Sequence, residues 1–280
     1  MSFGCPSLIK KGAPCIHMTW CVPEDKEAEV DAFWKSHEQF MRKTHTIGCV
    51  FDEDKTKPRL HHYYISKGPQ MVDIQDPSKG TTGHFLYTMC ESYVAEEDVK
   101  RHMDAAGEWE PFKDGTMMSM MQEYGLSSAV GSDKVFVGMA DGDGAPSLIK
   151  KGAPCIHMTW AVPEDKEAEM DAFWKDHEQF MRKTHTIGCV FDDEKKSRLL
   201  HYYIGKGPQM VDFQDPSKGT TGKILYTMGE SYVAEEDVKR HMDAAGGWEP
   251  MASGKMMSYM QEYGLSSAVG SDKVFVGMAD

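Results

Sequence analysis

The stretch "PSLIKKGAPCIHMTW" occurs twice in this chain of 280 residues, at Pro6–Trp20 and again at Pro146–Trp160. Each copy opens a unit that closes on "SSAVGSDKVFVGMAD", at Ser127–Asp141 and Ser266–Asp280. The two units align along their whole length with one single-residue gap near Lys57. Two units of this size are too few and too long for a solenoid, so the sequence indicates a duplicated domain.

The short link "GDGA" between the copies contains two glycines and predicts a flexible connection. The sequence therefore predicts a first domain at 6–141, a linker at 142–145 and a second domain at 146–280. Because the link is short, each half is present at a high effective concentration for the other. We expect an intramolecular pseudo-dimer and a monomeric chain.

Each copy predicts a strand, a helix, two strands, a helix and a final strand. "CIHMTWCV" is rich in strand-forming residues and lies between two prolines, and the second proline followed by "EDKEAE" is typical of a helix start. Further strands are expected in "RLHHYYIS", "FLYTMCESYV" and "DKVFVGMA", with a helix in "AEEDVKRHMDAA". This order is a ferredoxin-like βαββαβ unit of the α+β class. One such sheet leaves an apolar face open, which the second copy would cover.

Composition disfavours several classes of partner and reaction. The net charge of −13 argues against nucleic acid or an anionic membrane as partner. No apolar run approaches the roughly 18 residues that cross a bilayer, and the start "MSFGCPSLIKKGAP" lacks the apolar region of a signal peptide. These features predict a cytoplasmic protein. Of the seven cysteines only Cys15 with Cys155 and Cys49 with Cys189 recur, so we expect structural or incidental thiols, not catalytic ones.

Three stretches resemble the dimeric α/β-barrel superfamily, most closely its antibiotic-biosynthesis-monooxygenase-like domains. "THTIGCVF" is similar to the family's glycine turn after the first helix, and "DKVFVGMA" to its closing strand. "FLYTMCESYVAEEDVKRHM" is similar to its strand ending in a glutamate and an aromatic residue, followed by a helix. In that family two subunits pair their sheets into a barrel, and each keeps a cavity between sheet and helices. The resemblance implies two tandem ferredoxin-like repeats forming one intramolecular dimeric-type α/β barrel.

The family includes cofactor-independent oxygenases of aromatic compounds and also haem-degrading enzymes. The haem-degrading branch carries a tryptophan where this chain has Tyr93, and its axial histidine falls near Phe112. The first-strand asparagine of that branch is missing as well. The resemblance therefore implies chemistry without a dedicated cofactor, while haem held by another histidine, or a divalent metal, stays open.

Histidines form the one cluster of reactive side chains in the predicted cavity. His37 lies on the apolar face of the first helix, between Phe33 and Phe40. We expect three further histidines, one on the same helix and two on other elements, around that cavity. His17 would join them if it, and not Met18, faces inward. A histidine can accept a proton near neutral pH, which suits a general base. Two turns of helix separate His37 from His45, too far to share a metal ion.

Specific roles follow from this placement. The expected catalytic residues are His37, Glu91 and His102, with His177, Glu230 and His241 in the second copy. The expected substrate-binding residues are Trp20, His45, His62, Tyr64 and Tyr93, with Trp160, His185, His201, Tyr203 and Tyr232 in the second copy. No metal ligand is expected. The alternative is that the aromatic residues only fill the core and that Glu91 is a buried carboxylate paired with an arginine or a histidine.

The functional expectation is an oxygenase-like enzyme acting on a hydrophobic, aromatic small molecule, with a histidine as general base. The alternative is a non-catalytic protein that binds a hydrophobic ligand, a tetrapyrrole or a metal. We expect His37 and His177 to face the cavity and not solvent. A buried imidazole needs a hydrogen-bond partner, and an unpaired one costs about 1–3 kcal/mol. Glu91, Tyr64 or His102 could supply that partner.

Overall fold

The computed structural model describes residues 11–47, 56–73, 76–138, 149, 151–187, 195–212 and 215–277. It has a mixed α/β fold in which helices cover a largely antiparallel sheet. The first half contains β1 (Pro14–Pro23), η1 (Glu24–Lys26), α1 (Glu27–Thr44), β2 (Thr46–Ile47), β3 (Arg59–Met71), η2 (Pro77–Lys79), β4 (Thr81–Tyr93), α2 (Glu96–Ala106), α3 (Glu110–Lys113), α4 (Thr116–Tyr124) and β5 (Gly125–Gly138). A mixed fold of helices on an antiparallel sheet is confirmed; the linker at 142–145 and the domain boundaries beside it lie outside the described residues.

The second half repeats the same order. It contains β6 (Pro154–Pro163), η3 (Glu164–Lys166), α5 (Glu167–Thr184), β7 (His185–Ile187), β8 (Ser197–Met210), η4 (Pro216–Lys218), β9 (Thr220–Tyr232), α6 (Glu235–Ala245), α7 (Glu249–Ala252), α8 (Lys255–Tyr263) and β10 (Gly264–Gly277). Among the described residues, no helix is both long enough and apolar enough to cross a membrane.

The strands extend beyond the stretches of sequence that predicted them. β5 begins at Gly125, well before the expected "DKVFVGMA", because α4 passes directly into it. Glycine is required at this junction, since a Cβ on Gly125 would lie 2.4 Å from the carbonyl oxygen of Met121. The methionine-rich segment ahead of it forms α4, and the first helix ends at Thr44. The glycine therefore lets a helix and a strand join without a loop.

The four long strands of one half and the four of the other join into one continuous circuit of pairing. Each half has the order β5-β1-β4-β3 or its copy β10-β6-β9-β8. The last strand of each half then pairs antiparallel with the third strand of the other, β5 with β8 and β10 with β3. Eight strands thus form a closed ring, to which β2 and β7 add short parallel pairings. We call the side facing the centre of this ring the inner face, and the side that carries the helices the outer face.

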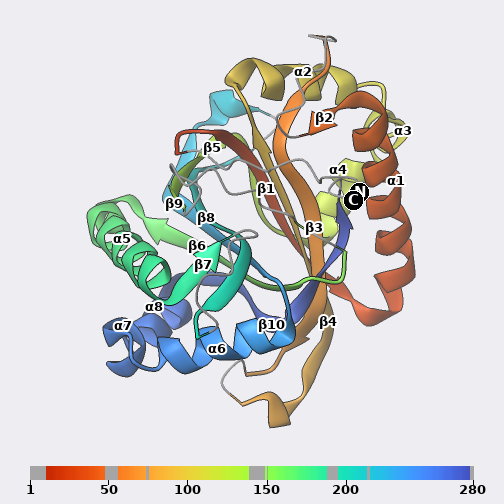
Figure 1. Ribbon diagram of the computed structural model, residues 1–280. Coiled ribbons are helices and arrows are strands. Elements are labelled where there is room, and N and C mark those ends of the chain that lie inside the picture. The colour runs from red at the N-terminus through yellow and green to blue at the C-terminus, as the bar shows by residue number, and fades with distance from the viewer. Residues whose placement is uncertain are drawn as a thin grey trace, which may run out of the picture.

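The outer face holds two separate hydrophobic cores, one in each half. Figure 1 shows α1–α4 and α5–α8 on opposite sides of the strands. In the first half Trp20 on β1 packs against Trp34 on α1, with ring centroids 4.5 Å apart. The inner face holds a third cluster, to which both halves contribute, including Tyr64 and Tyr203. Each half therefore has its own core, and the two halves share the centre.

Side chains also cross between the halves on the outer face. Phe275 of β10 packs on the first-half core, and the ammonium group of Lys67 lies 5.0 Å from its ring centroid. Phe136 of β5 makes the matching contact with Lys206 at 4.7 Å. Lys151 pairs with Glu38 of α1 at 3.1 Å. The halves therefore pack together through the strand seams, aromatic rings and ion pairs.

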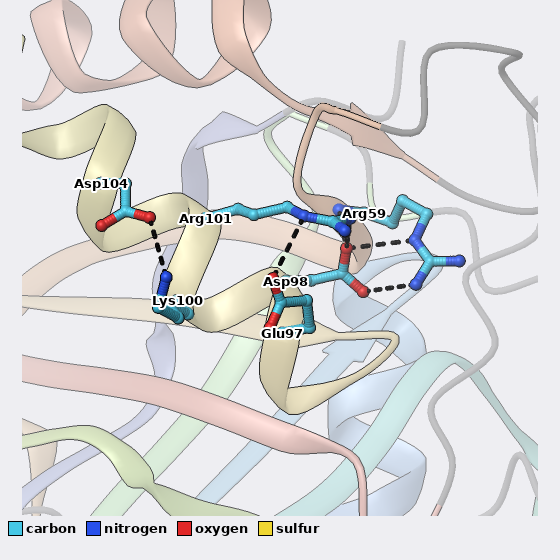
Figure 2. A network of polar contacts seen from close by, with 6 residues as sticks. All are labelled: Arg59, Glu97, Asp98, Lys100, Arg101 and Asp104. Atoms are coloured by element: carbon cyan, nitrogen blue, oxygen red, sulfur yellow. Dashed lines mark hydrogen bonds and ion pairs between the residues drawn. The ribbon is translucent and has the colours of Figure 1, made fainter.

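A buried carboxylate ties the start of α2 to the start of β3. Asp98 is completely buried, and Arg59 donates two side-chain hydrogen bonds to its two oxygens, at 3.1 and 2.8 Å. Figure 2 shows this fork, with Arg101 approaching the same carboxylate from the next turn of the helix. The second half repeats the fork between Arg198 and Asp237. A two-bond contact fixes the angle at which α2 leaves the sheet, and α2 carries His102.

Asp98→Ala should lower the free energy of unfolding by about 2 kcal/mol, because several charge-assisted hydrogen bonds to one buried acceptor are lost. Chemical denaturation measures this change. Lys100→Ala on the same helix is the matched control, because its pair with Asp104 lies in solvent with both side chains 69% exposed. Equal effects of the two substitutions would contradict the role given to Asp98.

Candidate functional site

A small cavity lies between the sheet and the helices of the first half. Its volume is about 30 Å³. We call it the helix-side cavity; it is lined by Ile16, Met18, His37, Met89, His102, Met103, Ala106, Trp109, Phe112, Met117 and Met118. Nine of these side chains are apolar and two are histidines, so the cavity is a mostly apolar chamber with two imidazoles. A volume of this size holds about one water molecule.

His37 is held between a tyrosine and a glutamate. Its side chain is buried with 3% exposure, which agrees with its predicted orientation. Its Nδ1 lies 2.9 Å from the Tyr63 hydroxyl, and its Nε2 lies 4.0 Å from Oε1 of Glu91. Burial, with a smaller contribution from His102, lowers the pKa of His37 to about 3. In the second half His177 repeats the arrangement with Tyr202 at 2.9 Å and Glu230 at 3.9 Å.

Glu91 is a fully buried carboxyl group. The Tyr93 hydroxyl donates a short hydrogen bond to its Oε2, whereas Oε1, on the side of His37, has no hydrogen-bond partner. Burial raises the pKa of Glu91 to about 8, against the opposing effect of Tyr93. Burial likewise raises the pKa of Glu230 to about 7. Each half therefore contains a buried carboxyl group that exchanges its proton near neutral pH beside a buried histidine, and in the first half that histidine lines the cavity.

Two further histidines form a pair beside the cavity. His45 Nε2 lies 2.9 Å from His102 Nδ1, and His45 Nδ1 lies 2.7 Å from the Thr44 hydroxyl. Burial lowers the pKa of His45 to about 2 and that of His102 to about 4. His185 and His241 repeat the contact at 3.1 Å. Of the pair, only His102 lines the cavity, so His45 acts as its hydrogen-bonding support.

Other expected site residues lie on the inner face, away from the helix-side cavity. Tyr64 bonds there with His157 at 2.8 Å and with His201 at 2.9 Å, and Tyr203 with His17 at 2.8 Å. The ring of His62 is tilted against that of Tyr203 with centroids 5.1 Å apart, and neither of its nitrogens has a hydrogen-bond partner. The expectation that one cavity gathers His62 with His37, His45 and His102 is therefore corrected, because the two faces of the sheet separate them.

The structure decides which way several residues of the strands point. Met18, not His17, lines the helix-side cavity. Of the three expected partners of His37, Glu91 lies 4.0 Å from Nε2, but the hydrogen bond at Nδ1 is made with Tyr63 and not with Tyr64, because adjacent residues of a strand point to opposite faces. Trp20 packs in the core beside Phe33 and Trp34 and does not line the cavity, and Trp160 repeats these contacts.

Trp109 is the lining residue that the sequence did not reveal. It stacks on Phe40 with centroids 5.7 Å apart, and its Nε1 donates to the Ser36 hydroxyl at 3.1 Å. It follows α2 in a tight turn, outside any periodic pattern, so its position gave no signal. The aromatic face of α1 formed by Phe33, His37 and Phe40, all of which contact the Trp109 ring, is the one feature that could have pointed to it.

The described cysteines carry free thiols, and none lines the cavity. Cys90 lies on the inner face; burial raises its pKa, but the combined effects of His157, His17 and Tyr203 outweigh burial and bring the pKa to about 7. Within the described ranges, no group of three or more histidine, cysteine, aspartate or glutamate side chains is arranged to hold a metal ion.

Comparisons with known proteins give remote likenesses. No family model matches the chain, and no curated protein matches it significantly. Among solved structures it is similar to a candidate monooxygenase from Lactobacillus acidophilus NCFM, with 8% identity, a TM-score of 0.42, and coverage of 95% of this chain and 94% of that one. It is also similar to an anthrone oxidase-like protein, with 10% identity, a TM-score of 0.47, and coverage of 95% and 93%. Likeness at this level assigns no function, so function is inferred below from the side chains.

The buried titratable groups predict a stability maximum near pH 6.5. His37, His45 and His102 have lowered pKa values in the folded state, so they stabilise it above their unfolded pKa and this stability is lost as pH falls below about 6.5. Glu91 and Glu230 have raised pKa values, so they bind more protons when folded, and stability falls as pH rises to about 8 and about 7.

Thermal unfolding followed between pH 5 and pH 9 tests this account. Glu91→Gln with Glu230→Gln should remove most of the decline above pH 6.5, which at about 1.4 kcal/mol per pKa unit amounts to roughly 2 kcal/mol for Glu91 and about 1 kcal/mol for Glu230. The decline below pH 6.5 should remain in the same variant. An unchanged alkaline decline would show that these carboxyl groups are ionised in the folded protein at neutral pH.

Proposed function

We propose that this protein is an oxygenase-like enzyme acting on a hydrophobic aromatic small molecule, with a histidine and glutamate pair as its base. The proposed scaffold is two tandem ferredoxin-like βαββαβ repeats forming one dimeric-type α/β barrel within a single chain. The closed ring of strand pairings supports this scaffold. The observation that carries the function is His37 facing an apolar cavity with the unpaired carboxyl oxygen of Glu91 behind it.

The glutamate sets the strength of the base. A histidine with a pKa of about 3 would not by itself remove a proton from a phenol or an activated carbon. Glu91, with a pKa of about 8, is matched to neutral conditions but does not line the cavity. The substrate's proton is therefore accepted at Nε2 of His37 and passed to Oε1 of Glu91, 4.0 Å away.

The hydrogen bond to Tyr63 selects the tautomer that this transfer needs. Nε2 can accept a proton only if the ring hydrogen is on Nδ1, which then donates to the Tyr63 oxygen at 2.9 Å. Tyr93 keeps Glu91 in place through the hydrogen bond to its Oε2. Tyr63 and Tyr93 are positioning residues in this scheme, Glu91 is the final acceptor of the proton, and His37 is the group that touches the substrate.

The suitable substrate has a weakly acidic CH2 group bonded to aromatic rings that conjugate it with a carbonyl; one hydrogen goes to the base and the second leaves later with the water. Removal of the first proton gives a carbanion, which transfers an electron to dioxygen, and the two resulting radicals combine into a peroxide anion. This anion takes a proton to form a hydroperoxide. The hydroperoxide loses water, so that one oxygen atom becomes a new carbonyl and the other leaves as water. The apolar walls favour this sequence because they keep solvent protons away from the carbanion.

Oxygen uptake with anthrone, which has such a CH2 group, tests the proposal. His37→Gln with His177→Gln should reduce the enzymatic rate at least about 100-fold, the usual contribution of a general base. His84→Gln, a partly exposed surface histidine with no counterpart in the second half, is the matched control and should keep the full rate.

The pH dependence of the rate distinguishes a histidine–glutamate pair from a histidine that acts alone. Wild-type activity should rise with pH through about 8 as Glu91 ionises, and Glu91→Gln with Glu230→Gln should lose this limb. Saturable binding of anthrone without oxygen uptake would contradict the enzyme and support a binding protein. A rate that survives both histidine substitutions would also contradict the proposed base.

A further inference from the structure

A groove on the surface lies directly beside the helix-side cavity. Its volume is about 330 Å³, roughly ten times that of the cavity itself. We call it the seam groove. One wall is formed by the first half and the other by the end of β8 and the residues after it in the second half; the lining residues are Met118, Met121, Gln122, Gly125, Leu126, Ser127, Ser128, Gln209, Met210, Val211 and Asp212. The second half has a matching groove of about 380 Å³ whose outer wall is Gln70–Asp73 of the first half.

One methionine belongs to both spaces. Met118 on α4 lines the helix-side cavity and also the seam groove. A methionine side chain has three rotatable bonds and adapts readily to a new neighbour. A change of its rotamer would therefore join about 30 Å³ of cavity to the groove without moving the backbone of α4. The cavity alone is too small for an aromatic ring, so a substrate of the proposed kind needs the additional space.

The sheet provides a continuous floor from one space to the other. In the pairing of β1 with β5, Met18 lies opposite Ser128. Met18 lines the cavity and Ser128 lines the groove, so two neighbouring side chains on the outer face span the boundary. The Oγ of Ser128 is buried without a hydrogen-bond partner, and so is that of Ser267 in the second half. A buried hydroxyl without a partner costs free energy, which a bound polar atom would recover.

The lining of the groove indicates the chemistry of its occupant. The lining is mixed: methionines and Val211 supply apolar surface, Gln122 and Ser127 add polar groups, and Gln209 supplies an amide whose oxygen already accepts a hydrogen bond from Thr221 at 2.9 Å. Asp212 and the net charge of −13 disfavour an anion. An uncharged, planar aromatic molecule with one hydroxyl or carbonyl oxygen fits this surface, with that oxygen at the buried Ser128 hydroxyl.

We propose that the seam groove and the helix-side cavity form one binding site for such a molecule, with Met118 as the movable partition and the opposite half as the outer wall. This inference rests on the proposed function for the identity of the inner, reacting end. It adds that each reaction site is completed by residues of the other half. Val211 therefore belongs to the site of the first half, and Val72 to the site of the second.

Methyl-labelled methionines in the full-length protein report on each half separately by NMR. With 2-naphthol as the probe, the methyl signals of Met18, Met89, Met118 and Met121 should shift together along one binding curve. Val211→Glu should raise the dissociation constant obtained from this curve about tenfold or more, because a charge enters an apolar contact. The signals of the second half, Met158, Met228, Met257 and Met260, should keep their affinity in that variant.

Val72→Glu is the matched control, since Val72 and Val211 are equally exposed at 55% and 56%. It should weaken binding at the second-half methionines and spare those of the first half. Ser128→Ala should abolish the preference for 2-naphthol over naphthalene at the first-half signals. The inference is overturned if each valine substitution affects its own half, or if saturating probe shifts Met118 and Met121 but not Met18 and Met89.

The outcomes also separate this inference from the proposed function. If each valine substitution weakens binding in the opposite half but anthrone causes no oxygen uptake, the proposed enzymatic activity is wrong and the shared binding site stands. If oxygen uptake depends on His37 but is unaffected by Val211→Glu and Val72→Glu, the proposed enzymatic activity stands and the shared binding site is wrong.

Discussion

The pairing of β5 with β8 and of β10 with β3 is the constraint on which the other features of the structure depend. Within one half, the order β5-β1-β4-β3 leaves two strands with unpaired backbone groups along one edge. Exposed edges of this kind favour association with other chains. Here each edge is paired with an edge of the other half, and the resulting ring creates the inner face, aligns the crossing rings of Phe136 and Phe275, and brings the end of β8 beside α4.

Burial then determines the chemistry of the outer face. The cavity wall is apolar apart from two imidazoles, so His37 stays neutral and Glu91 holds its proton to about pH 8. The same physical cause shifts the two groups in opposite directions, because burial penalises whichever form is charged. Glu91 therefore exchanges its proton near neutral pH, which an ordinary carboxyl group would not do, whereas His37 stays neutral there and can only relay a proton to it. The inner face also buries histidines, but there they bond to tyrosines of the other half.

The sequence predicted the elements and part of the site for identifiable reasons. The face of β4 that carries Met89, Glu91 and Tyr93 followed from simple alternation, and the orientation of His37 from the apolar positions around it on α1. β3 was harder, because its doublets "HH" and "YY" place the same residue type on both faces, so alternation could not distinguish Tyr63 from Tyr64. A register shift between Leu60 and His62 adds to this ambiguity. The seam groove had no local signal at all, since its walls meet only when the two halves pair.

Hydrogen exchange of the intact chain, followed by mass spectrometry, tests most directly whether the two halves are one folded unit. The backbone amides of β5 that face β8, and of β10 that face β3, should open only with the free energy of global unfolding, equal to that of β1 and β4. Such a result would show that the closed ring and both sites exist together or not at all. Exchange at the two seams through a smaller opening, with β1 and β4 still protected, would contradict it, because the halves would then separate while each stays folded.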